Sequence, residues 1–152
     1  MFPPKSDWVA PDTLPDLSSA KRIAVDLETK DPNLSVSGPG WATGNGYVTG
    51  FAIATDNWSG YLPIKHEGGG NLDEGLVKRC VNKTLSSNCD KIFHNALYDV
   101  GWLKREGIQL NGKIHDTVIA APLVDENRRR YSLNILGEEY CGDVKDESLL
   151  KE

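Results

Sequence analysis

The sequence has few cysteines and histidines, the residues that form disulfides and zinc sites in small secreted domains. Its three cysteines, Cys80, Cys89 and Cys141, form no CxxC pair, and its three histidines lie far apart. An odd set of unpaired cysteines argues against a disulfide framework and predicts a reducing compartment. That compartment would be the cytoplasm, or the host cytoplasm if the chain is viral. The same spacing excludes a zinc-finger type of site.

Long apolar runs are missing as well. No stretch reaches the roughly 20 apolar residues that a membrane-spanning helix requires, so we expect no membrane partner. The first 20 residues mix proline, aspartate and serine and have no apolar core of the signal-peptide kind. We therefore divide the chain into an N-terminal arm, residues 1–20, and one domain, residues 21–152, of ordinary single-domain size.

Positive charge is in deficit. The net charge is −5, from 22 acidic and 17 basic residues, which excludes a strongly basic, non-specific nucleic-acid binder. Six acids and two lysines between residues 138 and 152 supply −4 of that total. The rest of the chain is therefore almost neutral, which leaves room for a locally basic or metal-neutralised groove.

The apolar pattern predicts an α/β fold. In order, we expect a strand at 21–29, a hairpin of strands at 47–55 and 58–64, a helix capped by Asn71, a strand at 91–93, a helix at 96–106, a strand at 113–115, and helices after 116 and at 131–140. A long loop, residues 31–46, follows the first strand. Such an order predicts a mixed sheet, with an antiparallel hairpin and parallel strands, flanked by helices.

Two acidic residues stand at the end of the first predicted strand. Asp26 and Glu28 are two positions apart, so their side chains point to the same face, roughly 6.6 Å apart along the strand. At an effective dielectric near 20, two carboxylates at about that distance repel by about 2.5 kcal/mol. A divalent cation would relieve the repulsion, and carboxylate oxygens suit Mg²⁺ and Mn²⁺. The alternative is an ordinary polar strand end.

A second acidic position opens the helix after the short strand at 91–93. Asn95 and Asp99 are four residues apart, which places both on one helix face. Asp99 lies in a mostly apolar stretch that runs on to Trp102. Taken by itself, this segment favours an exposed aspartate on an amphipathic helix.

Together these segments resemble the first two motifs of the DEDD (DnaQ-like) 3′-5′ exonucleases. The matching pieces are Asp26-Leu27-Glu28 at a strand end and Phe93-His94-Asn95-Ala96-Leu97-Tyr98-Asp99 at a helix start. Other local details resemble phage-type family A DNA polymerases in particular, namely Gly38-Pro39-Gly40-Trp41, Tyr61-Leu62-Pro63-Ile64, His66 with the glycines that follow it, and Tyr131-Ser132-Leu133. The resemblance runs from about Lys21 to the C-terminus.

The resemblance implies a ribonuclease-H-like fold and a proofreading 3′-5′ exonuclease that hydrolyses the 3′ end of single-stranded DNA. In that family a two-metal site with Mg²⁺ or Mn²⁺ clamps the scissile phosphate. Carried over, the metal ligands and catalytic residues would be Asp26, Glu28 and Asp99. The positions that match contacts to the 3′-terminal nucleotides are Thr29, Asn95 and Tyr98.

The family's third motif, Tyr-x-x-x-Asp, has no match here. Four residues after Tyr140 stands Val144, and four after Tyr131 stands Ile135. We therefore expect a C-terminally truncated version of the fold: a fragment, a truncated reading frame or half of a split protein. It would be completed by a polymerase domain in cis or by a complementing chain. The alternatives are a catalytically impaired fragment that binds nucleic acid or docks on a polymerase, and a ribonuclease-D-like enzyme that trims RNA.

Overall fold

The computed structural model describes residues 9–143, so Val144 and the acidic tail beyond it lie outside the described residues. One sheet holds all five strands, in the order β3-β2-β1-β4-β5. The strands are β1 (Arg22–Lys30), β2 (Tyr47–Ala54), β3 (Ser59–Pro63), β4 (Asp90–Phe93) and β5 (Ile114–Asp116). Strands β1, β2 and β3 pair antiparallel, whereas β4 and β5 join parallel to β1. The predicted mixed sheet is confirmed.

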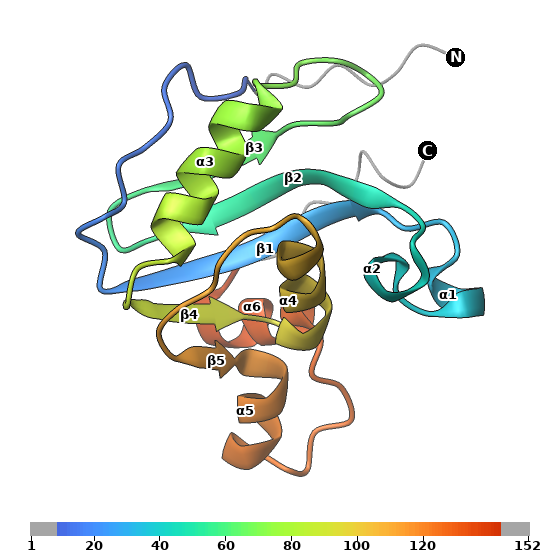
Figure 1. Ribbon diagram of the computed structural model, residues 1–152. Helices are drawn as coiled ribbons and strands as arrows, with labels where there is room; N and C mark the ends of the chain where they lie inside the picture. Colours follow the sequence, from blue (N-terminus) through green and yellow to red (C-terminus); the bar gives the residue numbers. More distant parts are fainter. Residues whose placement is uncertain (1–8, 144–152) are drawn as a thin grey trace.

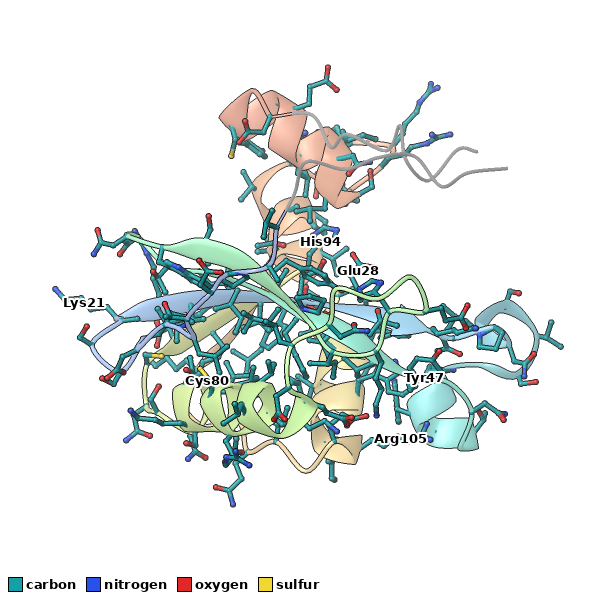
Figure 2. The ribbon with its side chains drawn as sticks, turned by 90° about the horizontal axis from the view of Figure 1, so that it is seen from above. Lys21, Glu28, Tyr47, Cys80, His94 and Arg105 are labelled. Atoms are coloured by element: carbon teal, nitrogen blue, oxygen red, sulfur yellow. The ribbon has the colours of Figure 1, made fainter. Side chains whose placement is uncertain are left out.

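Helices cover both faces of this sheet. They are α1 (Leu34–Ser37), α2 (Gly40–Thr43), α3 (Glu74–Leu85), α4 (Ala96–Arg105), α5 (Thr117–Val124) and α6 (Leu133–Cys141). Helices α3 and α4 lie against one face, and α6 lies on the opposite side (Figures 1 and 2). Within residues 9–143, none of these helices is long and apolar enough to cross a membrane.

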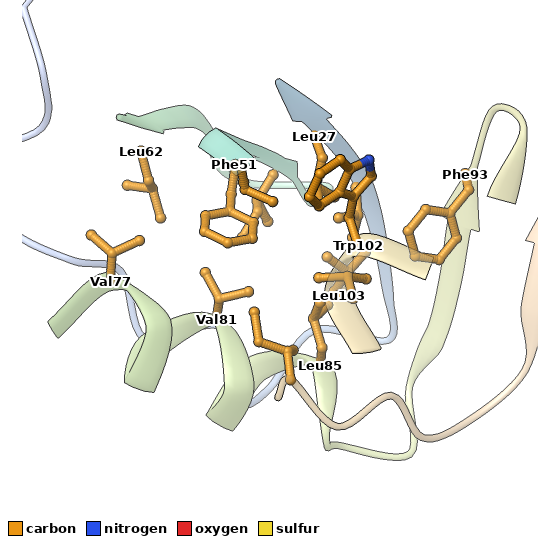
Figure 3. Close-up of a cluster of buried hydrophobic side chains, with 14 of the residues drawn as sticks. Leu27, Phe51, Leu62, Val77, Val81, Leu85, Phe93, Trp102 and Leu103 are labelled. Carbon is orange, nitrogen blue, oxygen red and sulfur yellow. The ribbon is translucent and has the colours of Figure 1, made fainter. Parts of the chain in front are cut away.

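The main core lies between the sheet and the α3–α4 face. Alternation along β1 turns Val25 and Leu27 toward the helices, and β2 adds Phe51 opposite Leu27. Helix α3 contributes Val77 and Val81, and both side chains are fully buried (Figure 3). Trp102 and Leu103 of α4 complete this cluster. The core therefore fixes which β1 side chains face away from the helices, and these include Asp26 and Glu28.

The long loop after β1 is folded into α1 and α2 and is fastened to α4. The Arg105 guanidinium donates to the carbonyl oxygens of Gly40, Gly44 and Asn45, at 2.6 to 3.1 Å. Trp41 lies so close to Gly101 that any side chain at position 101 would overlap the indole ring. These contacts hold the segment that follows the acidic end of β1.

The prediction for the start of α3 was wrong. Asp73, and not Asn71, caps α3, because the Asp73 carboxylate accepts a hydrogen bond from the Leu76 N–H at 2.7 Å. The Asn71 amide instead binds both the N–H and the carbonyl of His66. On α4 the buried side chains include Asp99, Trp102 and Leu103, whereas Leu97 is exposed.

Candidate active site

Asp26 and Glu28 lie where the strand pattern placed them. Both side chains are exposed, while Leu27 between them is buried in the core. Glu28 lies on the side of the sheet that α6 occupies, as does His94 at the end of β4 (Figure 2). The two carboxylates therefore share the face opposite the main core.

Asp99 reaches the same region from α4. Strand β4 pairs with β1 only as far as Ala24, so the edge of β1 beyond that point is not covered by β4. There the Leu27 backbone N–H donates a hydrogen bond to the Asp99 carboxyl group. The Asp99 side chain is buried, with 3% exposed. The charges of Asp26 and Glu28 also act on the Asp99 carboxyl group, so Asp99 lies within electrostatic range of both.

The pKa of Asp99 is raised by burial and by the charges of neighbouring carboxylates. Burial, followed by the negative charge of Asp26, raises this pKa from 3.8 to about 7, with smaller effects from Asp116 and Glu28. The Leu27 N–H acts in the opposite direction, because it stabilises the charged form. A carboxyl group with such neighbours is a candidate functional group, since folding has brought like charges together in a partly buried place.

The donor set suits a hard divalent cation but does not enclose one. Carboxylate oxygens are the ligands that Mg²⁺ and Mn²⁺ prefer. Among residues 9–143, however, no three acidic, histidine or cysteine side chains converge closely enough to form a ready metal cage. Electrostatic repulsion acts over several ångströms. The charge of Asp26 can therefore raise the pKa of Asp99 although the carboxylates do not converge on one point. The described carboxylates fit a metal site that further oxygens must complete.

Tyr98 and Thr29 meet at the end of β1. The Tyr98 hydroxyl lies 2.8 Å from the Thr29 hydroxyl oxygen and donates to an Asp31 carboxylate oxygen at 3.0 Å. The same Asp31 oxygen accepts the Gly40 N–H at 2.8 Å. These bonds tie the residue after Glu28 to α4 and to the α1–α2 segment.

Asn95 does not share a helix face with Asp99, so that prediction was wrong. It is an exposed residue in the left-handed conformation, with φ of 73°, immediately before α4 begins. Its N–H and that of Ala96 donate to the two oxygens of the Asp116 carboxylate, at 3.0 and 2.8 Å. Asp116 therefore holds the start of α4, and with it Tyr98 and Asp99, next to the end of β5.

Tyr61 is a site neighbour that the sequence reasoning missed. Across the sheet Tyr61 stands opposite Ala52, which stands opposite Asp26. Its ring lies over Gly50, the partner of Glu28, and its hydroxyl occupies the place where a Gly50 side chain would begin. A glycine inside a buried strand was the available signal, since it marks a close approach of another group.

The Tyr61 hydroxyl stays protonated at neutral pH. Burial, together with smaller effects of the charges of Glu28 and Asp26, raises its pKa to about 12. The hydroxyl lies 2.5 Å from Nε2 of His66, whose backbone is the one that Asn71 clamps. A neutral hydroxyl with a fixed partner therefore stands beside the two exposed carboxylates.

An apolar groove runs alongside the acidic residues, on the face of the sheet away from the main core. Its volume is about 390 Å³. The groove is lined by Asp26 and by small and apolar side chains. These include Ala24, Ala52, Ala54, Ile92 and Leu133. A second apolar groove of about 390 Å³ continues between α5 and α6. The acidic site therefore borders a surface that could accept a further apolar element.

This mixed sheet with flanking helices is a ribonuclease-H-like fold, and Asp26 and Glu28 lie on the part of β1 beyond its pairing with β4. The chain matches the family model described as 3′-5′ exonuclease over residues 9–151. It is 42% identical over 153 residues to a DNA-directed DNA polymerase of Pseudomonas phage M6. That alignment covers 96% of this chain and 23% of the polymerase. The chain belongs to the 3′-5′ exonuclease family found in such DNA polymerases.

Other comparisons agree. The DNA polymerase I of Borreliella burgdorferi is 29% identical over 85% of this chain, which corresponds to 13% of that polymerase. Brucella melitensis NrnC has the same fold, with a TM-score of 0.62 and 22% identity over 88% of this chain and 59% of its own, and one of its structures contains Mg²⁺. Escherichia coli RNase D, an exoribonuclease, gives a TM-score of 0.62 at 15% identity, over 90% of this chain and 32% of its own. The family is metal-dependent.

Proposed function

We propose that this exonuclease domain removes nucleotides from the 3′ end of single-stranded DNA by two-metal hydrolysis. The observation that supports the proposal is that the charges of Asp26 and Glu28 act on the buried Asp99 carboxyl group, which the Leu27 N–H of the same strand also contacts. These three carboxylates would hold the metal ions, which activate water and stabilise the leaving oxygen. Residues 21–152 form the domain and residues 1–20 an arm in this proposal. The three free thiols support a reducing, cytoplasmic setting.

The chain's own residues would then position the substrate. Thr29 and Tyr98 present hydroxyl groups next to Glu28, and Asn95 presents an exposed amide at the start of α4. They would contact the 3′-terminal nucleotides. Tyr61 would bound the site on the other side of Glu28, since its ring covers Gly50.

DNA is the substrate that the relatives favour. The sequence matches at 42% and 29% identity are DNA polymerases, whereas RNase D at 15% identity supports the fold alone. A ribonuclease-D-like RNA trimmer is therefore the second candidate. Digestion of matched DNA and RNA oligonucleotides separates the two.

The apolar groove supports a proposal about the partner. We propose that a helix with an apolar face and the Tyr-x-x-x-Asp pattern covers the groove and places its aspartate next to Asp26, which lines it. The helix would come from a polymerase domain in cis or from a complementing chain. Losing one positioned catalytic group can cost about 10²–10³ in rate, so we expect residues 1–152 alone to cleave far more slowly than the completed site.

The test compares residues 1–152 with the same residues fused to the downstream segment of the phage relative. Both act on a 5′-labelled single-stranded oligonucleotide with Mn²⁺. We expect a 3′-to-5′ ladder from the fusion, lost on Asp26→Ala, and little cleavage without the segment. No cleavage by the fusion would favour a nucleic-acid-binding or polymerase-docking module instead. Robust cleavage by residues 1–152 alone would show that the groove needs no added helix.

A further inference from the structure

The hydrogen bonds around Tyr98 determine which hydroxyl group is the donor in the hydrogen bond between Thr29 and Tyr98. A phenol carries one proton, and Tyr98 donates it to Asp31 at 3.0 Å. The contact of 2.8 Å between Tyr98 and Thr29 must then run the other way, from the threonine hydroxyl to the tyrosine oxygen. Thr29 has thereby used its only side-chain proton. Toward the site it can accept a hydrogen bond but cannot donate one.

The contacts of Asp31 keep its carboxylate in place as the acceptor for the Tyr98 hydroxyl. The oxygen that accepts from Tyr98 also accepts the Gly40 N–H at 2.8 Å. Gly40 in turn belongs to the segment whose carbonyls Arg105 binds. The second Asp31 oxygen is buried and has no hydrogen-bond partner. The carboxylate is therefore held with one oxygen toward Tyr98.

We propose that Asp31 is a positioning residue that, through Tyr98, makes Thr29 an obligate acceptor for the terminal sugar. The inference rests on the proposed function, in which Thr29 contacts the 3′-terminal nucleotide. Thr29 follows Glu28 directly, at the register shift that ends regular pairing of β1 with β2, and its side chain is partly exposed. An acceptor there favours an end that carries a 3′-hydroxyl donor. It gives no such advantage to an end with a 3′-O-methyl group, whose oxygen can only accept.

The test measures affinity, so it does not depend on turnover. Fluorescence anisotropy with Ca²⁺ gives the affinities of residues 1–152 for 5′-labelled oligonucleotides that end in a 3′-hydroxyl, which can donate, or a 3′-O-methyl group, which can only accept. The integrity of the oligonucleotides is checked on gels. The wild-type chain is expected to prefer the 3′-hydroxyl by about two- to tenfold, the value of one neutral hydrogen bond. Thr29→Ser keeps the acceptor and the preference, whereas Thr29→Val loses it.

Variants of Asp31 separate positioning from packing. Asp31→Asn keeps an oxygen that can accept from both Gly40 and Tyr98, so the preference should remain. Asp31→Ala removes that oxygen and frees Tyr98 to donate to Thr29. The Thr29 proton is then available to a 3′-O-methyl oxygen, so the affinity ratio should fall toward one. A merely structural role would weaken binding of both ends equally and leave the ratio unchanged.

Each result decides the matter. A wild-type ratio of one, or an Asp31→Ala variant that keeps the preference, overturns the inference and leaves the proposed function standing. If Asp31→Ala does not fold, Tyr98→Phe breaks the same chain of hydrogen bonds without touching the α1–α2 segment and should give a ratio near one. Failure of the wild-type chain to bind either oligonucleotide overturns the proposed function, and this inference with it.

Discussion

Asp99 and Asp26 lie close enough that the charge of one raises the pKa of the other. They come from different elements, α4 and β1, and the Leu27 N–H holds Asp99 at the strand edge. Such a contact between like charges opposes folding when both are ionised. The first two predictions follow from it.

The first concerns the pH dependence of stability. Because folding raises the pKa of Asp99 from 3.8 to about 7, its stabilising contribution is complete below pH 3.8 and is lost as the pH rises through about 7. Asp99→Asn removes the charge and can still accept from Leu27. In EDTA at pH 8 we expect it to raise the free energy of unfolding by roughly 1–3 kcal/mol. Urea unfolding between pH 5 and 8 measures this, with Asp12→Asn as the exposed control.

At pH 5 the gain from Asp99→Asn should shrink, because the wild-type carboxyl is then mostly protonated. A variant that is less stable than wild type at pH 8 would contradict the placement of Asp99 beside charged neighbours.

The second prediction concerns metal ions. Mg²⁺ or Mn²⁺ should raise the melting temperature, because a cation that binds the folded state relieves the repulsion among Asp26, Glu28 and Asp99 and stabilises by mass action. Differential scanning fluorimetry over a metal titration measures the shift, and Asp26→Ala should abolish it. A shift that survives Asp26→Ala would place the ion elsewhere.

A third prediction tests how Tyr61 reaches the site. Gly50→Ala puts a methyl group where the Tyr61 hydroxyl and ring lie, so we expect a loss of about 1–3 kcal/mol in the free energy of unfolding. Gly68→Ala is the matched control, since nothing lies near its added atom and the change should stay within about 0.5 kcal/mol. In a Tyr61→Ala background Gly50→Ala should cost little. An equal cost in both backgrounds would rule out the contact.

A fourth prediction concerns Lys91, a fully buried lysine in β4. Its ammonium donates to the carbonyl oxygens of Ser87, Cys89 and Asn111. Lys91→Met would leave those carbonyls without a donor, and we expect a loss of about 2–4 kcal/mol by urea unfolding. Lys113→Met, at an exposed position, should change little. A near-neutral Lys91→Met would mean that water reaches the carbonyls.

Much of the fold could be predicted from the sequence, because hydrophobic periodicity and turn residues indicate where its strands and helices lie. The hairpin, the two parallel strands and the face shared by Asp26 and Glu28 follow from patterns of two residues and from glycine and aspartate signals. The helix expected after residue 116 is present as α5, and the Asp116 side chain caps it by accepting from the Val118 N–H.

The features that could not be predicted from the sequence depend on contacts between residues that lie far apart in the chain. Buried Lys91 has no local pattern, because its three acceptors come from the loop before β4 and from residue 111. The exposure of Leu97 depends on how Trp102 orients α4 against the sheet. The place of Tyr61 beside Glu28 depends on strand register across Gly50. Asn95 departs from helical geometry because Asp116 binds its N–H.

The most direct test of the acidic site is anomalous diffraction from crystals soaked in Mn²⁺. We predict an anomalous peak bound by the carboxylates of Asp26 and Glu28, with the Asp99 carboxylate facing it directly or through water, and no such peak in Asp26→Ala crystals. A pair of metal ions spans only about 4 Å. Manganese bound away from these residues, or an Asp99 carboxylate more than about 12 Å from that of Asp26 and so beyond the reach of such a pair, would contradict the account.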